Sequence, residues 1–452
     1  MPGNWIHLRG INTNWSDEVL RSANFSNHQI TLSGGTGKTR IFSSIGLYNE
    51  EGIALRTDMK RVSVRNNVDY ADDKFNLQVS TNLAYTKRNF QQSTVGNNLG
   101  NPFLTSAVNV PYAKVRNDDG SYVTGIGASF AAANQLDLTK YDQNYNDQLK
   151  ATLGFVAGYK LNKDFSVNLT TGADFRETQN TNYGSKLAFV RQSSTSITGR
   201  AGFQSEGLTR FLRTTVRPSV NYRHMFADKH DVELGVYGEY VREFNKAFTL
   251  TGFGTDPKRP NTIAAVTQGN ASNQLFAQVG GGKSQTSLLS GLFQGRYTYN
   301  GKYTLTGSFR RDGSSKLPTD TRWQNFYSVG AIWDATKEDF IKNIRAINVL
   351  RLKLSYGGSG NADNFPGGDF PYQPTYTQGN YSGLQTIFAN NPGNPGLKWE
   401  TTWVLNFGLD YELFNRRVYG DINLYEKRTK DLFVLKTLSA TSGFGALRCK
   451  CW

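Results

Sequence analysis

Apolar and polar residues alternate with a period of two along most of this chain. Residues 165–176 carry apolar side chains at nearly every second position with polar side chains between them, and residues 402–413 repeat the pattern. Successive side chains of a strand point to opposite faces, so this alternation predicts strands with one apolar and one polar face. About fourteen segments follow the pattern, and the clearest of the others are 77–85, 149–159, 232–240, 303–309 and 350–356. We therefore predict an all-β fold.

The length of the predicted strands suits a membrane. Many run for about ten residues or more, which lets a tilted strand cross a bilayer, whereas strands of soluble proteins usually have about five or six residues. Aromatic residues stand near the strand ends, where a membrane barrel places an interfacial girdle. They include Tyr70, Tyr85, Tyr159, Phe175, Tyr297, Tyr299 and Tyr356.

The connections between the predicted strands fall into two length classes. Tight turns are predicted at 161–163, 227–230, 300–301 and 414–416. Long loops rich in Gly, Asn, Pro and Ser cover about 88–147, 245–284 and 357–398. Short turns on one rim and long loops on the other predict a transmembrane antiparallel β-barrel of the outer membrane, here a partial barrel of about fourteen strands. A soluble all-β carbohydrate-binding protein would also show alternation, and detergent dependence distinguishes the two.

The composition is that of a folded strand protein. Hydrophobic residues make up 38% of the chain, but 13% of the residues are aromatic and 46 are Gly. Such aromatic content is too high for a disordered chain and favours strands. The two cysteines, Cys449 and Cys451, both lie in the last four residues, so no disulfide framework holds the body of the chain.

The formal net charge of +15 raises the question of a nucleic-acid partner. The basic residues are spread along the chain rather than clustered in one arm or helix. Many fall at alternate positions of predicted strands, as do Arg176, Arg213, Arg242, Arg351 and Lys353. This distribution suits a solvated face or a polar barrel lumen better than a surface that follows phosphates, so we predict no nucleic-acid partner.

No set of residues predicts catalysis. Two glycine-rich segments, 34–39 (GGTGKT) and 280–284 (GGGKS), lack the first glycine that a phosphate-binding loop needs, and we predict turns or loops there. His224 and His230 flank a short turn, but their spacing matches no zinc pattern. We therefore predict a protein that is not an enzyme, with no catalytic residues, no metal and no cofactor.

Binding is the remaining chemistry. The loop 357–398 mixes aromatic rings with Asn, Gln and Gly, which suits oligosaccharides or peptides. We predict substrate contacts from four of its aromatic residues, Phe370, Tyr372, Tyr376 and Tyr381, and the same loop also carries Phe365 and Phe388.

Several longer stretches are more specific than alternation alone. They are SGGTGKTRIFSSIGLYNEEGI (33–53), FRRDGSSKL (309–317), WQNFYSVGAIWDATKEDFIKN (323–343), LRLKLSYGGSGN (350–361) and NPGLKWETTWVLNFGLDYELFNRRVYGDINLYEKRTKDLFV (394–434). The chain resembles the SusC/RagA family of TonB-linked outer-membrane proteins in these segments and in their order.

This resemblance implies a barrel of about 22 strands with a plugged lumen. It implies import of oligosaccharides, glycans or peptides, with a SusD-like surface lipoprotein as the lid and the TonB–ExbB–ExbD complex as the energy source. Outer-membrane lipid would surround the barrel.

Relative to that family, we expect a partial barrel over residues 1–441 and an aberrant tail over 442–452, which a frameshift would explain. The signal peptide, the TonB box and the plug domain, which precede the barrel in the family, are not recognisable in this sequence. A non-functional gene fragment of the importer is therefore the alternative interpretation.

Overall fold

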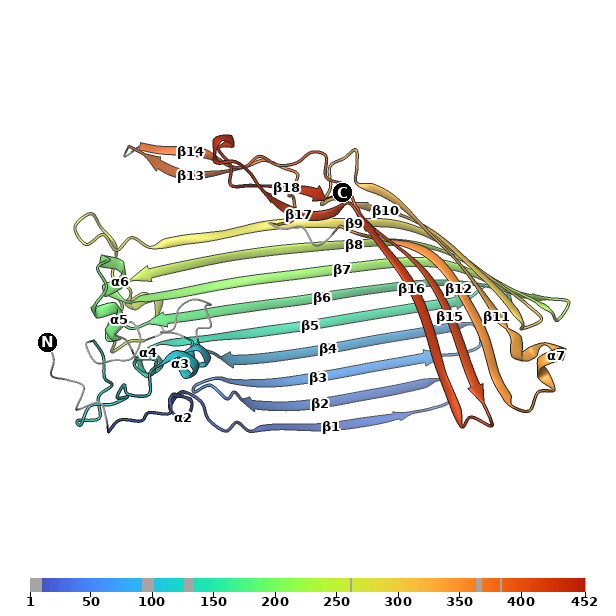
Figure 1. Ribbon diagram of the computed structural model, residues 1–452, viewed down its shortest axis with the longest axis horizontal. Coiled ribbons are helices and arrows are strands. Elements are labelled where there is room, and N and C mark those ends of the chain that lie inside the picture. Colours follow the sequence, from blue (N-terminus) through green and yellow to red (C-terminus); the bar gives the residue numbers. More distant parts are fainter. Residues whose placement is uncertain are drawn as a thin grey trace.

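One antiparallel sheet of 14 strands dominates the computed structural model (Figure 1). The structure describes residues 10–91, 101–125, 134–260, 262–362, 368–382 and 384–451. The sheet strands are β1 (Phe25–Gly35), β2 (Thr39–Glu51), β3 (Asp58–Ala71), β4 (Phe75–Asn89), β5 (Gln143–Lys160), β6 (Phe165–Gly184), β7 (Phe203–Phe226), β8 (His230–Phe253), β9 (Gln278–Tyr299), β10 (Tyr303–Ser314), β11 (Trp323–Asp334), β12 (Ile347–Asn361), β15 (Glu400–Leu413) and β16 (Val418–Lys430). The predicted all-β class, antiparallel pairing and number of strands are confirmed.

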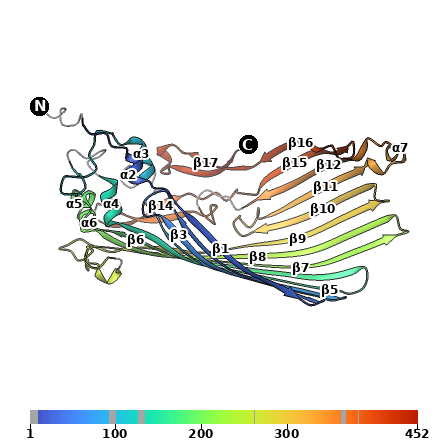
Figure 2. The same cartoon turned by 90° about the horizontal axis from the view of Figure 1, so that it is seen from below.

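Strands that follow one another in the chain lie side by side in the sheet, and two hairpins stand apart from it, one between β12 and β15 and one after β16. The first hairpin, β13 (Thr375–Tyr381) and β14 (Leu384–Asn391), leaves the sheet between β12 and β15. The second pairs β17 (Leu432–Thr437) with β18 (Ala446–Cys451). The tail from 442 onward, for which alternation predicted no barrel strand, thus contributes β18 to this hairpin and not to the large sheet. The large sheet curls but does not close, with β1 and β16 at its two ends (Figures 1 and 2).

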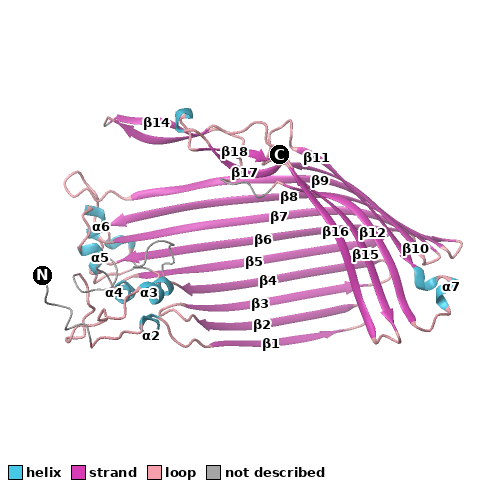
Figure 3. Cartoon of the chain, viewed as in Figure 1, coloured by secondary structure: helices cyan, strands magenta, loops and turns pink. Residues whose placement is uncertain are grey.

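Helices are short and lie before β1 or between strands, as Figure 3 shows. None among the described residues has the length and apolar character needed to cross a membrane. They are α2 (Trp15–Val19), α3 (Pro102–Val108), α4 (Gln135–Tyr141), α5 (Phe189–Gln192), α6 (Ile197–Ala201), η2 (Ile263–Ala265), η3 (Ala335–Lys337), α7 (Asp339–Lys342) and η4 (Ala440–Ser442). Trp15 and Val19 of α2 pack against Ala113, Val115 and Leu136, which joins the segment before β1 to the β4–β5 connection at the long-loop rim.

The register gives the sheet two chemically different faces. Ile45, Val64 and Leu83 lie beside one another on β2, β3 and β4, and their exposed fractions are 56%, 42% and 43%. Large apolar side chains continue in this way across the same face of the sheet, which we call the outward face. A soluble monomer seldom exposes so extensive an apolar surface, whereas a membrane barrel turns such a band to lipid. The opposite face, which carries the polar residues of each strand, is called the lumen face.

Tight turns join the strands at one rim, as predicted. Asn300 and Gly301 between β9 and β10 have φ values of 48° and 64°, the positive values of a type I′ turn. Ala227 and Asp228 between β7 and β8 also have positive φ, as do residues 414–416 between β15 and β16. We call this end the short-turn rim.

The long loops are shorter than the sequence predicted, because the strands extend past the apolar band. β8 runs to Phe253 and β9 begins at Gln278, so the loop predicted at 245–284 comprises 254–277. The prediction of a loop at 280–284 is wrong, since Gly280, Gly281 and Gly282 pair with residues of β8. Glycines carry no side chain that could alternate, so the pattern cannot mark this part of β9. The other glycine-rich segment, 34–39, does hold the turn between β1 and β2.

Candidate ligand site on the lumen face

Charged residues of neighbouring strands meet on the lumen face. Glu239 of β8 accepts hydrogen bonds from Arg217 of β7 at 2.6 Å and from Arg310 of β10 at 2.8 Å. Nε of Arg310 also donates to Asp312 at 2.6 Å, and its Nη2 donates to Ser290 at 2.9 Å. Because side chains alternate along each strand, a polar residue at every second position builds this continuous network. Opposite charges held this close fix both side chains in one orientation.

A second row of charges lies nearer the long loops. Glu243 of β8 is 3.6 Å from Arg213 of β7 and 3.8 Å from Lys316, which follows β10. The buried Lys316 is also 3.8 Å from Asp369 in the connection between β12 and β13. Together the two rows surround a cavity of about 390 Å³ that Arg213, Glu243, Arg310, Asp312 and Lys316 line. Side chains of both signs and several serines therefore face one space.

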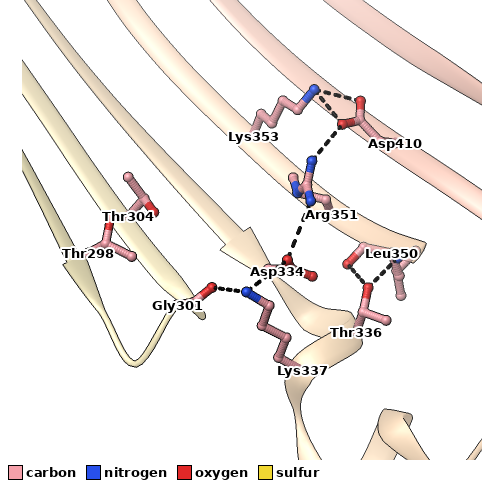
Figure 4. Close-up of polar contacts among 10 residues, drawn as sticks. All are labelled: Thr298, Gly301, Thr304, Asp334, Thr336, Lys337, Leu350, Arg351, Lys353 and Asp410. Atoms are coloured by element: carbon pink, nitrogen blue, oxygen red, sulfur yellow. Dashed lines mark hydrogen bonds and ion pairs between the residues drawn. The ribbon is translucent and has the colours of Figure 1, made fainter. Parts of the chain in front are cut away.

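A separate group of charged residues lies nearer the short-turn rim (Figure 4). Lys353 of β12 contacts Asp410 of β15 at 2.5 Å, and Arg351 lies 3.8 Å from the same carboxylate. Arg351 also reaches Asp334 of β11 at 3.4 Å, and Lys337 of η3 is 3.8 Å from that aspartate. The lumen face thus carries paired charges both at the cavity and near the turns.

A hydrophobic cluster closes the long-loop end of the cavity. Leu317, Phe326, Ala362, Leu397 and Trp399 form its buried members. The rings of Phe326 and Trp399 meet edge to face with centroids 5.8 Å apart, and Trp399 Nε1 donates to the carbonyl of Arg322 at 2.7 Å. The cluster fixes the β10–β11 loop to the segment before β15, because three chain segments bury their apolar side chains together.

Two of the predicted substrate-contacting residues lie at this cluster. Phe370 and Tyr372 form an edge-to-face pair with ring centroids 6.4 Å apart, and Tyr372 packs on the cluster. The neighbouring Asp369 is the carboxylate that approaches Lys316 in the cavity wall. The structure therefore places Tyr372 against the cluster that borders the lumen cavity, with Phe370 next to it, although neither ring lines the cavity itself.

The other two predicted residues lie elsewhere. Tyr376 and Tyr381 belong to β13 and are exposed by 66% and 73%. Five positions separate them, so they point to opposite faces of the hairpin. The four aromatic residues do not form one cluster. Phe365 lies outside the described residues.

The charged residues of the cavity were not predicted as a site. The sequence assigned Arg213, Arg351 and Lys353 to a polar lumen, but it gave no signal that Glu243 and Lys316 would meet, since their separation depends on strand register. Arg242 is an exception to the predicted arrangement. It belongs to the alternate residues of β8 that face outward, and its guanidinium donates to Gln285 at 2.8 Å.

His224 and His230 do not share a metal site. His224 Nδ1 lies 2.9 Å from Asp164, whereas His230 Nδ1 lies 2.6 Å from the hydroxyl of Tyr297. Both are strand residues rather than turn residues. Within the described ranges, no group of three or more His, Cys, Asp or Glu side chains could hold a metal ion.

Comparison with known proteins assigns the chain to a family. Residues 89–446 match the family model described as TonB dependent receptor-like, beta-barrel. The chain belongs to the TonB-dependent receptor family. Barrels of this family lie in the outer membrane, and its members are receptors and transporters.

Relatives confirm the predicted resemblance to the SusC/RagA proteins. TonB-dependent receptor P39 of Formosa agariphila is 27% identical over 93% of this chain and 38% of its own length. TonB-dependent receptor SusC of Bacteroides thetaiotaomicron is 23% identical over 97% of the chain and 44% of its own length. The solved structure of the RagAB peptide transporter matches 97% of the chain and 48% of its own with a TM-score of 0.85 and 22% identity, which shows the same fold. The chain therefore spans less than half the length of these relatives.

Proposed function

We propose that this chain forms part of the wall of an outer-membrane importer that takes up oligosaccharides, glycans or peptides, and that it catalyses no reaction. The observation that carries the proposal is the pairing of an apolar outward band with a charged lumen face that encloses a cavity beneath the long loops. A pore wall needs both faces, because lipid covers one and a hydrated ligand passes the other.

The lumen cavity and the Phe370–Tyr372 pair serve as one ligand site. The flat aromatic rings would stack on a sugar ring or an apolar side chain at the mouth of the cavity. Arg213 and Lys316 would meet carboxylate or hydroxyl oxygens, while Glu243 and Asp312 would accept from hydroxyls, amides or an ammonium group. Tyr376 and Tyr381, exposed on the β13–β14 hairpin, would contact a ligand or a lid protein further out.

The proposed partners follow from the family. A SusD-like lipoprotein would close the long-loop rim over the ligand, and TonB–ExbB–ExbD would supply energy through a plug domain. The RagAB structure, a peptide transporter by its title, supports this proposal by its similarity in fold.

Ligand binding by the full chain in detergent micelles tests the proposal. Oligosaccharide and peptide mixtures are screened by thermal shift, and hits are measured by calorimetry. We expect Tyr372→Ala to weaken the best ligand about tenfold, because a stacked aromatic ring contributes roughly 1–1.5 kcal/mol.

The matched control is Tyr240→Ala, which removes the same ring from the outward face of β8, where the residue is exposed by 42%. It should leave the affinity unchanged. A Kd unaffected by Tyr372→Ala and Tyr376→Ala, or no binding by any member of either ligand class, would contradict the proposed site.

A further inference from the structure

A groove crosses the outward face near the short-turn rim. The row of side chains across β9, β10, β11, β12 and β15 is Tyr297, Leu305, Ala331, Leu354 and Phe407. Ala331 is the only small residue of this row. The next row toward the rim contains Tyr303, Trp333 and Leu352, and the space between the two rows is a groove of about 490 Å³. Its lining is almost wholly apolar, because the polar strand residues point into the lumen.

The end of the groove nearest the turns is polar and contains one acidic and one basic side chain. The hydroxyl of Tyr303 donates to Glu338 Oε1 at 2.5 Å, and Trp333 Nε1 donates to the same oxygen at 3.2 Å. Lys302 Nζ is 3.1 Å from Glu338 Oε2. Two residues of the groove wall thus hold the carboxylate directly, and its neighbour is a lysine. These hydrogen bonds, that from Tyr303 first, hold the pKa of Glu338 below its usual value.

We infer that this groove binds one phospholipid of the leaflet at the short-turn rim, with an acyl chain over Ala331 and a phosphoethanolamine headgroup at Lys302 and Glu338. The rings of Tyr297, Tyr303 and Trp333 mark the interfacial level, where the headgroup begins. The phosphoethanolamine zwitterion matches this ion pair, since its primary ammonium donates hydrogen bonds to the carboxylate, which the trimethylated ammonium of a choline headgroup cannot do, and its phosphate meets the lysine. An anionic headgroup without an amine would instead face Glu338 with the wrong charge. This inference requires the outward face to lie in a bilayer, and it does not depend on the imported substrate.

Quenching of Trp333 fluorescence by brominated lipid chains measures the occupancy of the groove. The full chain is reconstituted in phosphatidylcholine vesicles with increasing fractions of dibrominated phosphatidylethanolamine, or of dibrominated phosphatidylcholine for comparison. The difference in fluorescence between the unaltered chain and Trp333→Phe is the signal of Trp333 alone. We expect half-maximal quenching at an at least threefold lower fraction of the ethanolamine lipid.

Two variants and a control locate the binding. Ala331→Leu fills the groove, so quenching should follow the bulk lipid fraction equally for both headgroups. Ala173→Leu makes the same change on the outward face of β6, between Leu153 and Thr214, and should keep the preference. Glu338→Gln removes the carboxylate charge and should move the preference to brominated phosphatidylglycerol, because Lys302 then meets an anionic headgroup alone.

The inference is overturned if the unaltered chain quenches equally with both headgroups, which would indicate only a non-selective lipid shell. Retention of the ethanolamine preference in both Ala331→Leu and Glu338→Gln would overturn it too. If Ala331→Leu fails to assemble, Glu338→Gln decides, since its substitution lies outside the strands.

Discussion

At the scale of single residues, Glu239 holds the centre of the lumen-face network. Its carboxylate binds two arginines, and its side chain is exposed by only 12%. Glu239→Gln leaves Arg217 and Arg310 facing each other without their shared anion. We expect the free energy of unfolding to fall by about 2 kcal/mol, because removal of one partner of a largely buried ion pair leaves uncompensated charge. Urea denaturation of the refolded chain in detergent, followed by tryptophan fluorescence, measures the change.

The control at this scale is Asp118→Asn. Asp118 pairs with Lys114 at 3.2 Å, but both side chains are largely exposed in the connection between β4 and β5. Exposed pairs contribute little, so a change within about 0.5 kcal/mol is expected. Equal losses for the two variants would show that the network around Glu239 has no special role in stability.

The sequence could assign residues to faces but could not assign partners. Alternation placed Arg213 on the lumen side, because a period of two is a property of the strand itself. That Lys316 would approach both Glu243 and Asp369 depends on the path of two connections, and no local pattern records such a path. The same reason explains why the sequence could not show that Tyr372 packs on the hydrophobic cluster. Tyr376 and Tyr381 point apart for a local reason, since an odd spacing within one strand puts them on opposite faces.

At the scale of the elements, the β9–β10 turn depends on its glycine. Gly301 has a φ of 64°, which costs an L-residue roughly 1–2 kcal/mol. An added Cβ would meet only the flexible end of Lys337, so the cost of Gly301→Ala should be backbone strain of about 1 kcal/mol. The urea midpoint measures it. Asn300→Gly, which keeps positive φ accessible, should change stability by less than about 0.5 kcal/mol, and a larger loss there than in Gly301→Ala would contradict a type I′ requirement.

The connection between β11 and β12 should respond to pH through Glu338. Its pKa is lowered in the folded protein, chiefly by the hydrogen bond from Tyr303 and then by those from Lys302 and Trp333. A lowered carboxyl pKa contributes stability that is present above the ordinary value near 4.5 and is lost as pH falls through the folded value. Amide hydrogen exchange of residues 335–346 measures how often this connection opens. The population of the open form should stay constant from pH 7 to 5 and should rise below about pH 4.5. Glu338→Gln should abolish this increase, and an unchanged acid response in that variant would refute the assignment.

Element boundaries were predictable only inside the apolar band. The predicted segment 232–240 lies within β8, which runs from His230 to Phe253. In the half of β8 that is farther from the β7–β8 turn, Arg242 and Lys246 interrupt the outward-facing set that includes Phe244 and Phe248, so the alternation there is too irregular to mark a strand. Hydrogen bonds to β7 and β9 hold these residues in the strand, and such pairing is invisible in a single sequence.

At the scale of the whole molecule, the sheet separates lipid from water, and a pair of adjacent substitutions tests this directly. Val79 and Ser80 are neighbours on β4, with Val79 beside Phe155 on the outward face and Ser80 beside Asn67 and Gly154 on the lumen face. Val79→Lys places a charge in the lipid band and should cost roughly 2–4 kcal/mol of folding free energy in vesicles. Ser80→Lys adds the same charge one position later in a hydrated lumen and should cost less than about 1 kcal/mol. Folding into phosphatidylcholine vesicles, titrated with urea and followed by fluorescence, compares them. In a water-soluble sheet both positions would be solvated and the two lysines would cost nearly the same, so equal effects would refute the membrane orientation, whereas a penalty confined to Val79→Lys fixes which face meets lipid.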